Sequence, residues 1–433
     1  MTPEVIGVLG IIILIVLFLL RVPVSISLIL VGFFGTSIIR GIDIAFAQLG
    51  RTPFDTASSY SLSVIPLFIL MGILLSYTGI GQDLFRTIDN WLGHIRGGIG
   101  IATIGTAGIF SAISGSLNAT TATMTKISFP EMKKYNYHDR LSTACVAAGG
   151  TLGVLIPPSV VMILYGILTR EPIGKLLIAG IIPGILQMLI FMATVYILVR
   201  RNPELAATRT EKATLSERMQ SLVHIIPFLL LFLLSIGGIY LGVFTPTEAA
   251  GVGAVGAIII SLLMRRLDMK IMKKSLDETV RISVNIFLII IGATLFGQFL
   301  TISQIPVKLA TAIADIDLSP YIILTLILVI LFILGLFIDG LSIIVLTLPI
   351  LYPIIIQLGF NGIWFAVIMV IITNIGALTP PLGLSVYVIK GVVKEVPLST
   401  IFRGVVPMIY AIALCILILI LFPELATFLP SLM

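Results

Sequence analysis

Two stretches of the chain place glycine, proline and hydroxyl residues inside apolar sequence: "GGTLGVLIPPSVV" (149–161) and "NIGALTPPLGL" (374–384). Proline removes a backbone donor and clashes with the preceding helical turn, and glycine adopts dihedral angles that other residues avoid. Both stretches are therefore predicted to interrupt a helix. The freed carbonyl oxygens are hard ligands suited to a small cation, and the N-terminus of a half-helix suits a carboxylate.

A predicted apolar hairpin precedes each interrupted helix, with "SAISGSLNATTATM" (111–124) at the turn of the first and "FIDGLSII" (337–344) at the turn of the second. Unsatisfied backbone groups cost on the order of several kcal/mol each within a membrane, so a facing hairpin, water or an ion must meet them. The candidate groups in the first copy are Ser114, Gly115, Ser116 and Asn118 at the turn, with Thr151, Gly153 and Pro157 at the break. Those in the second copy are Asp339, Gly340 and Ser342, facing Asn374, Gly376, Thr379 and Pro380.

Asp339 is the only charged residue between Leu318 and Ile389. An acid at membrane depth is costly and indicates a functional site, here one that couples to a cation or a substrate. The alternative is that Asp339 caps the second half of its hairpin by accepting backbone hydrogen bonds at a helix N-terminus. The two roles are compatible. The many hydroxyls of "SLNATTATMT" also include some that satisfy only their own backbone.

The elements that carry these residues are predicted to be membrane-spanning helices. The 433-residue chain is 58% hydrophobic and 11% charged, outside the range of soluble domains. Apolar segments of about 20 residues recur along it, which is too long for the strands of an outer-membrane barrel. The first segment lacks a basic leader and a cleavage site, so we expect a retained span. Cys145 and Cys415 lie in apolar runs without ligand-like spacing, which predicts neither a disulfide nor a metal site.

We expect an all-α polytopic fold that starts on the outside. The predicted crossings are 4–20, 22–39, 61–79, 141–169, 176–199, 222–242, 248–264, 282–302, 361–389 and 404–422, and the segments 99–130 and 319–358 are predicted to be re-entrant. This arrangement puts 21 of the 26 Lys and Arg residues on the cytoplasmic side, as the positive-inside rule requires. Arg40, Arg51, Arg170, Lys175 and Lys308 remain outside. The net charge of +6 thus reflects orientation rather than nucleic-acid binding.

The order of elements repeats. A span (61–79), an interfacial arm (81–98), a hairpin and a broken span are followed later by a span (282–302), an arm (303–318), a hairpin and a broken span. An offset of 225 aligns Gly72 with Gly297 and Gly115 with Gly340. Five crossings separate the opening spans, so the copies face opposite ways, as inverted repeats of transporters do. A duplication kept only for packing would not explain matching helix breaks.

The organisation that follows has four parts. Residues 1–60 form N-terminal scaffold spans, 61–199 the first repeat, 200–281 a cytoplasmic linker with scaffold spans, and 282–433 the second repeat with the last span. Within the linker, 200–219 and 265–278 are predicted to be polar connectors at the membrane surface.

Enzymatic chemistry is not indicated. His94, His138 and His224 lie near span ends or in loops, Asp339 has no second intramembrane acid, and no phosphate-binding loop appears. In "TPTEAA" (245–250), Thr245, Pro246 and Glu248 match a helix capping box, which we favour over a catalytic Glu248.

Four motifs together resemble the large membrane subunit of tripartite ATP-independent periplasmic (TRAP) transporters: "FSAISGSLNATTATM", "GGTLGVLIPPSVVMILYG", "GVFTPTEAAGVGAVGA" and "NIGALTPPLGLSVYVIKG". The resemblance covers essentially the whole chain. It implies an elevator-type transporter of the bacterial inner membrane, related in architecture to divalent-anion sodium symporters. Sodium would drive uptake of a carboxylate-bearing solute, for which sialic acid is the first expectation and a C4-dicarboxylate the second.

The resemblance also assigns roles to residues. It implies sodium sites built from Ser114, Asn118, Thr151, Gly153 and Pro157 in the first copy and from Asp339, Asn374, Gly376, Thr379 and Pro380 in the second. The substrate would lie between the hairpin tips, against Ser114, Gly115, Ser116, Asp339, Gly340, Ser342 and Thr379.

Two partners are implied as well: a small four-helix membrane subunit and a periplasmic protein that delivers the substrate. Because the chain begins almost directly with its first span, we expect the small subunit to be a separate polypeptide. The alternatives are a stand-alone divalent-anion sodium symporter and, in another class, a channel or structural membrane scaffold.

Overall fold

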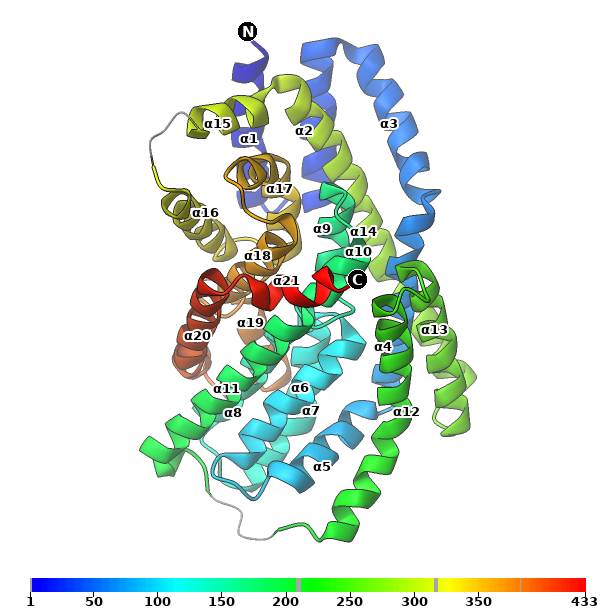
Figure 1. The fold of residues 1–433 in the computed structure, drawn as a ribbon, viewed down its shortest axis with the longest axis vertical. Helices are drawn as coiled ribbons and strands as arrows, with labels where there is room; N and C mark the ends of the chain where they lie inside the picture. The colour runs from blue at the N-terminus through cyan, green and yellow to red at the C-terminus, as the bar shows by residue number, and fades with distance from the viewer. Residues whose placement is uncertain (1, 208–211, 315–317, 382) are drawn as a thin grey trace.

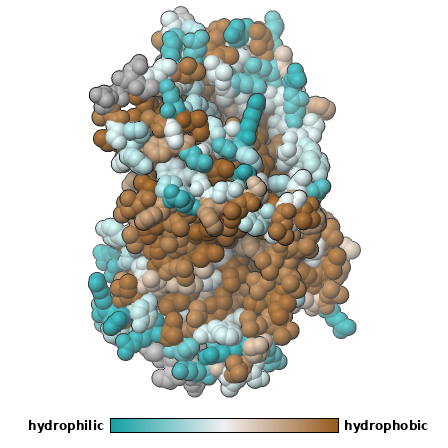
Figure 2. Space-filling model, viewed as in Figure 1, coloured by the Kyte–Doolittle hydropathy of each residue, from teal (hydrophilic) through white to brown (hydrophobic). Residues whose placement is uncertain are grey.

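The part of the chain described by this computed structural model, residues 2–207, 212–314, 318–381 and 383–433, is helical and contains no β-strand. Seven of its helices are long and apolar enough to cross a bilayer. Figure 2 shows hydrophobic surface over the middle and lower parts of the molecule, with hydrophilic residues gathered towards its upper and lower ends. The predicted multi-pass, all-helical membrane fold is confirmed.

One group of helices includes the longest helix, α14 (Met269–Ser303), and its members contact α14 either directly or through a neighbouring helix. This group comprises α1 (Pro3–Leu19), α2 (Val24–Arg40), α3 (Ile42–Ala57), the short helix η1 (Tyr60–Ser63), α4 (Val64–Tyr77), α12 (Leu215–Tyr240) and α13 (Pro246–Leu263). A β-carbon on Gly32 would lie 2.7 Å from the carbonyl carbon of Leu295, so glycine is needed where α2 crosses α14. Helix α14 is the opening helix of the second repeat, which was predicted to start at residue 282. Its first 13 residues precede that position.

In this group one sequence prediction is wrong and one helix was not predicted. The segment 265–278 is not a surface connector, because residues from Met269 onward continue without interruption into α14. Helix α3 was not predicted at all, since Arg51, Pro53 and Asp55 break its apolar character. In the connector 200–219, the structure contains the short helix η3 (Pro203–Leu205) and the start of α12, and residues 208–211 lie outside the described chain.

The predicted caps are confirmed. The Thr245 hydroxyl accepts from the Glu248 backbone over 3.3 Å, and the Glu248 carboxylate accepts from the Thr245 backbone over 2.8 Å. Thr214 and Glu217 form the same capping box at the start of α12. Glu248 is therefore part of the cap of α13, as the sequence indicates.

An amphipathic arm precedes each hairpin. These arms, α5 (Ile80–Leu92) and α15 (Ile305–Ala314), lie at opposite ends of the molecule in Figure 1, α5 at the lower end and α15 at the upper end. The second arm was predicted over 303–318, of which 315–317 lie outside the described residues. Arg266, which lies between α13 and α14, binds the first arm. Its guanidinium pairs with Asp83 of α5 and donates to the Thr78 carbonyl over 3.2 Å.

The hairpins and interrupted helices lie where the sequence predicts them. The first hairpin consists of α6 (Gly98–Ser114) and α7 (Leu117–Lys134), and the second of α16 (Pro320–Gly335) and α17 (Gly340–Gln357). The first interrupted helix is α8 (Asp139–Thr151), followed by the short helix η2 (Leu152–Val154) and α9 (Val160–Thr169); the second is α18 (Gly362–Gly376) and α19 (Leu384–Val392). The 17 residues of α6 extend about 25 Å, a little less than a bilayer core.

The structure shifts the alignment of the two repeats. Helix α7 begins at Leu117 and α17 at Gly340, α8 begins at Asp139 and α18 at Gly362, and each pair is 223 residues apart. The predicted offset of 225 is therefore wrong by two residues in this region. With the corrected offset, Ser116 is equivalent to Asp339 and Gly153 to Gly376. The first break, residues 152–159, and the second break, residues 377–383 without the undescribed residue 382, then contain equivalent proline pairs.

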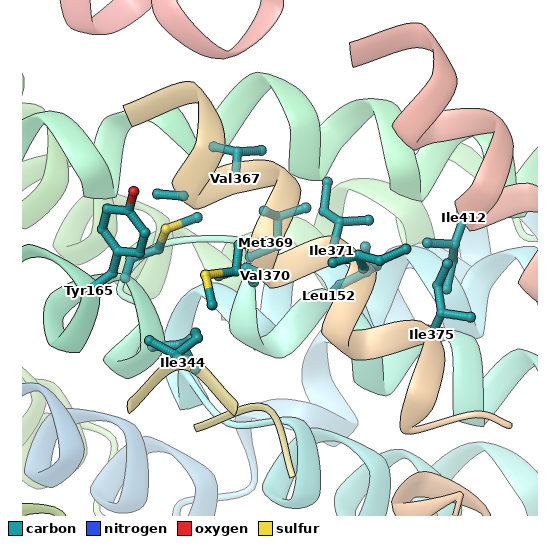
Figure 3. Close-up of a cluster of buried hydrophobic side chains, with 14 of the residues drawn as sticks. Leu152, Tyr165, Ile344, Val367, Met369, Val370, Ile371, Ile375 and Ile412 are labelled. Carbon is teal, nitrogen blue, oxygen red and sulfur yellow. The ribbon is translucent and has the colours of Figure 1, made fainter. Parts of the chain in front are cut away.

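Helix α18 forms the centre of the core around the breaks. Figure 3 shows its Val367, Val370 and Ile371 among side chains of other elements. These neighbours include Leu152, Tyr165, Ile344 and Ile412, from η2, α9, α17 and the last long helix, α20 (Leu398–Leu421). The remaining helices are α10 (Ile173–Ala179) and α11 (Ile181–Arg201), which follow α9, and the terminal α21 (Glu424–Ser431), which packs on α10. Both repeats thus share one core.

Candidate functional site

A cavity of about 500 Å³ lies where the two hairpin tips meet the scaffold. Ser114, Gly115 and Ser116 line it from the first tip, and Asp339 and Gly340 from the second. Its other walls come mainly from α4, α7, α9, α18 and the first half of α14. Two segments that are more than 220 residues apart in sequence therefore meet at one space.

The first tip is built from short polar contacts. The hydroxyl oxygens of Ser114 and Thr120 lie 2.7 Å apart, and the Ser116 hydroxyl caps α7 by accepting from the Ala119 backbone over 3.4 Å. Gly115 has a φ of +56°, and a β-carbon there would overlap the carbonyl oxygen of Pro158. A β-carbon on Gly153 would lie 2.7 Å from the Ser116 carbonyl oxygen. Glycines on both sides thus allow the first tip to touch the first break.

A helix outside the hairpins supports the first break. Gln187 of α11 is 1% exposed, and its side-chain nitrogen donates to the Thr151 hydroxyl over 3.2 Å. Thr151 in turn donates to the Ala148 carbonyl over 2.7 Å. The side-chain oxygen of Gln187 is buried and has no partner in the described chain. A buried carbonyl oxygen without a donor is a candidate ligand for a cation or a water molecule.

At the second tip, Asp339 caps α17. One carboxylate oxygen accepts from the Ser342 backbone over 3.1 Å, and the other accepts from the Ser342 hydroxyl. The capping role predicted for Asp339 is confirmed, and Asp339 also lines the cavity. The carboxylate therefore faces the cavity while it remains bonded to its own helix. Capping and ion binding are both open to it, because a carboxylate has about four acceptor sites.

The second break is partly satisfied by its own backbone. The carbonyls of Asn374, Ile375 and Gly376 accept from the amides of Ala377, Leu378 and Thr379 over 3.0 to 3.1 Å. The Thr379 hydroxyl donates to Ile375 over 2.7 Å. The Asn374 side-chain nitrogen, in contrast, is buried without a partner in the described chain. Asn374 also lines the cavity, so its side-chain amide is available to a bound solute or water molecule.

The predicted residues divide into two groups. Those that line the cavity are Ser114, Gly115, Ser116, Asn118, Asp339, Gly340 and Asn374. Those that do not are Thr151, Gly153, Pro157, Ser342, Gly376, Thr379 and Pro380. Within this second group the first break is buried, Thr151 and Pro157 included, whereas Pro380 is exposed. The two breaks are thus unlike in their surroundings despite their similar sequences.

Three charged residues line the cavity: Asp339, Lys126 and Glu278. Glu278 accepts from the Tyr77 hydroxyl, and the Lys274 ammonium lies 4.5 Å from the centre of the Tyr77 ring. Lys126, Glu278 and Gln187 were not predicted as site residues from the sequence. For Lys126 the signal was present, since it is the only charge between Gly97 and Pro130.

Hydrogen bonds join the first repeat to the second repeat away from the hairpin tips. The Tyr352 hydroxyl of α17 donates to Glu171 over 2.7 Å, and the Tyr165 hydroxyl of α9 donates to the Gly362 carbonyl over 2.8 Å. At the far end of α7, Lys133 pairs with Glu395 over 3.5 Å. A hydrogen bond from its own backbone amide, together with the Lys133 ammonium, lowers the pKa of the Glu395 carboxyl. The two repeats are thus bonded to each other on both sides of the tips.

The site offers oxygen ligands rather than a transition-metal set. Among the described residues no three His, Cys, Asp or Glu side chains cluster as metal ligands do. Carboxylate, amide, hydroxyl and carbonyl oxygens are present at the tips and breaks, and these suit hard cations. A cation held by Asp339 would sit beside the cavity that the tips enclose.

The chain is similar to known transporter subunits along nearly its whole length. The family model described as the DctM component of tripartite ATP-independent periplasmic transporters matches residues 11–425. The C4-dicarboxylate TRAP transporter large permease protein DctM of Pseudomonas aeruginosa is 36% identical over 87% of this chain and 88% of its own length. The sialic acid TRAP transporter large permease protein SiaM of Vibrio cholerae is 31% identical over 95% of both chains.

Solved structures share the fold. The YdaH transporter of Alcanivorax borkumensis superposes with a TM-score of 0.63 over 90% of this chain and 88% of that chain, at 14% identity. MtrF of Neisseria gonorrhoeae superposes with a TM-score of 0.61 over 89% of this chain and 84% of that chain, at 13% identity. At these identities the likeness concerns the fold alone. From the family model and its relatives, the chain belongs to the DctM family of large membrane components of TRAP transporters.

Proposed function

We propose that the chain carries out sodium-driven, secondary active uptake of a carboxylate-bearing solute in the bacterial inner membrane. The cavity between the two hairpin tips is the observation that carries this proposal. Asp339 and Glu278 bring two negative charges to its lining, and Lys126 brings one positive charge. Such a lining repels a carboxylate until a cation enters, which is the behaviour that coupled uptake needs.

Sodium is the proposed coupling ion. In the second repeat the proposed ligands are Asp339 with the carbonyls or side chains of Asn374, Gly376, Thr379 and Pro380, of which the exposed Pro380 is the weakest candidate. In the first repeat they are Ser114, Asn118, Thr151, Gly153 and Pro157. The buried oxygen of Gln187, which has no partner in the described chain, supports a cation near Thr151. Carboxylate and carbonyl oxygens are the ligands that hard cations prefer.

The substrate is proposed to lie between the tips, near Ser114, Gly115, Ser116, Asp339 and Gly340. The predicted contacts Ser342 and Thr379 are weaker candidates, because both hydroxyls already bond to Asp339 and Ile375 respectively. Relatives are named for C4-dicarboxylate, sialic acid and isethionate, and all three are organic anions. Sialic acid is our first candidate for this chain and a C4-dicarboxylate the second.

Transport is proposed to follow an elevator mechanism, in which the hairpins and interrupted helices move as one body against the scaffold. The hydrogen bonds between the two repeats support this proposal. A small four-helix membrane subunit and a periplasmic binding protein are the proposed partners. The cavity is proposed to open towards the cytoplasm, because Tyr77 ends α4 and Glu278 lies in the first part of α14, which is rich in lysine.

Uptake by proteoliposomes tests this proposal. Vesicles that contain this chain and its small subunit are prepared with a sodium-free interior and are mixed with the binding protein. Entry of radiolabelled N-acetylneuraminate and succinate is then followed under an inward sodium gradient. We expect saturable uptake that needs sodium and all three components. Uptake by this chain alone would favour a stand-alone symporter, and sodium-independent, non-saturating flux would support a channel or scaffold and contradict the carrier.

A further inference from the structure

The apolar part of each hairpin carries a single charge. Asp339 is the only charged residue from Leu318 to Ile389, and Lys126 is the only one from Gly97 to Pro130. The charges have opposite signs, and both residues line the same cavity. A charge in the middle of an apolar hairpin needs a reason in each case, because it is costly at membrane depth.

Lys126 lies in the middle of α7 rather than at its end, and its exposed side chain lines the cavity. It is the tenth of the 18 residues of α7, so its Cα lies about 13 Å along the helix axis from the tip. Helical side chains lean towards the helix N-terminus, which for α7 is the tip. Ala119, Ala122 and Thr123 occupy the preceding turns of the same face and also line the cavity. These small residues leave room for the lysine side chain to extend towards the tip.

Lys126 has no charged partner of its own. Within the described part of the chain, no ion pair or hydrogen bond engages its ammonium, although two carboxylates line the same cavity. Those carboxylates are already bonded, Glu278 to the Tyr77 hydroxyl and Asp339 to Ser342. An exposed ammonium that lines a cavity and has no partner in the described chain is available to an anion.

We propose that Lys126 binds a carboxylate of the transported solute and gives the cavity its selectivity for anions. This inference rests on the proposed function and adds to it the residue that recognises the anionic group. Asp339 and its cation lie at one tip, and Lys126 supplies the opposite charge from the other hairpin. A solute that carries no negative charge gains nothing from Lys126 and is therefore bound weakly.

Binding of two probes to the full chain in detergent tests the inference. Radiolabelled succinate and N-acetylneuraminate are titrated in sodium chloride and in potassium chloride, with Lys126→Gln, Lys126→Arg and Lys134→Gln beside the wild type. Lys134 is the matched control, since it lies on the same helix, pairs with Glu131 and does not line the cavity. The thermal midpoint as a function of sodium concentration serves as a second readout.

We expect Lys126→Gln to raise the half-saturating concentration of the bound probe by about tenfold or more, because it removes one side of a charged pair. Lys126→Arg keeps the charge and should stay close to the wild type, as should Lys134→Gln. Stabilisation by sodium should be the same in all four proteins.

Two results would overturn the inference while leaving the proposed function intact. One is wild-type affinity for the carboxylate in Lys126→Gln. The other is an equal weakening of the sodium and carboxylate responses, which would mark Lys126 as a purely structural residue. If the wild type binds neither probe in sodium, the proposed function fails and this inference falls with it.

Discussion

Gln187 donates a hydrogen bond to the Thr151 hydroxyl over 3.2 Å, and this bond joins α11 to the start of the first break. The same face of α11 approaches the break closely, because β-carbons on Gly180 and Gly184 would overlap Leu155 or lie 2.6 Å from Ile156. The repeat 2 counterpart differs, since the aromatic ring of Phe402 covers Gly383 of the second break. The two breaks therefore have different neighbours, an amide for one and an aromatic ring for the other.

Gln187→Leu should weaken the response to sodium while sparing the fold. Leucine removes a hydrogen bond worth about 1 kcal/mol, but it also removes a buried oxygen that has no partner in the described chain, and these effects offset each other. We expect the thermal midpoint without sodium to stay near that of the wild type and the half-saturating sodium concentration for uptake to rise. Gln357→Leu, at the exposed end of α17, is the control. An unchanged sodium titration would remove Gln187 from the cation site.

The two roles of Asp339 can be separated by a pair of substitutions. Asparagine caps helices about as well as aspartate, whereas alanine does not, and losing a cap costs about 1 kcal/mol. We expect Asp339→Asn to keep the thermal stability of the wild type and Asp339→Ala to lose some of it. Both should abolish sodium-stimulated uptake while expression and membrane insertion persist. Full uptake by Asp339→Asn would take the charge out of the mechanism.

Local signals made the breaks and hairpins predictable from sequence. Proline and glycine act within a few residues, so "LIPP" and "LTPP" locate the interruptions without knowledge of the rest of the fold. The capping box at Thr245 and the cap at Asp339 are local in the same sense. By contrast, the repeat offset was read from the identity of Gly115 and Gly340, while the equivalent residues in space, Ser116 and Asp339, differ in type.

Tertiary packing decides what the sequence did not reveal. Gln187 belongs to a helix that no motif connects to Thr151, and only the folded chain brings them together. Helix α14 begins with a polar stretch that resembles a loop in the sequence. In the structure this stretch continues without a break into the apolar part of α14, which packs on α2. Lys126 is a different case, because the isolation of a single charge in an apolar hairpin was visible in the sequence and applies to it as well as to Asp339.

Glu248→Ala should lower stability and leave transport per molecule unchanged. Glu248 bonds only to Thr245 among the described residues and does not line the cavity. Loss of half a capping box should cost up to about 1 kcal/mol, which a thermal melt in detergent can detect. Glu217→Ala, in the capping box of α12, should behave alike. Loss of uptake with an unchanged melting temperature would instead give Glu248 a direct part in transport.

Gly376→Ala should disrupt the contact between the second hairpin and the second break. A β-carbon at Gly376 would overlap the backbone of Gly335, and backbone atoms cannot move aside as a side chain can. We expect a loss of about 1 to 3 kcal/mol in stability and a marked fall in uptake, because the shift displaces Asn374 and the tip together. Gly297→Ala on α14 is the matched control, since no atom lies within 4 Å of its added β-carbon. That variant should equal or exceed the wild type in stability, because alanine favours a helix more than glycine does. If Gly376→Ala retained both stability and uptake, the close packing of hairpin on break would not be needed for the site.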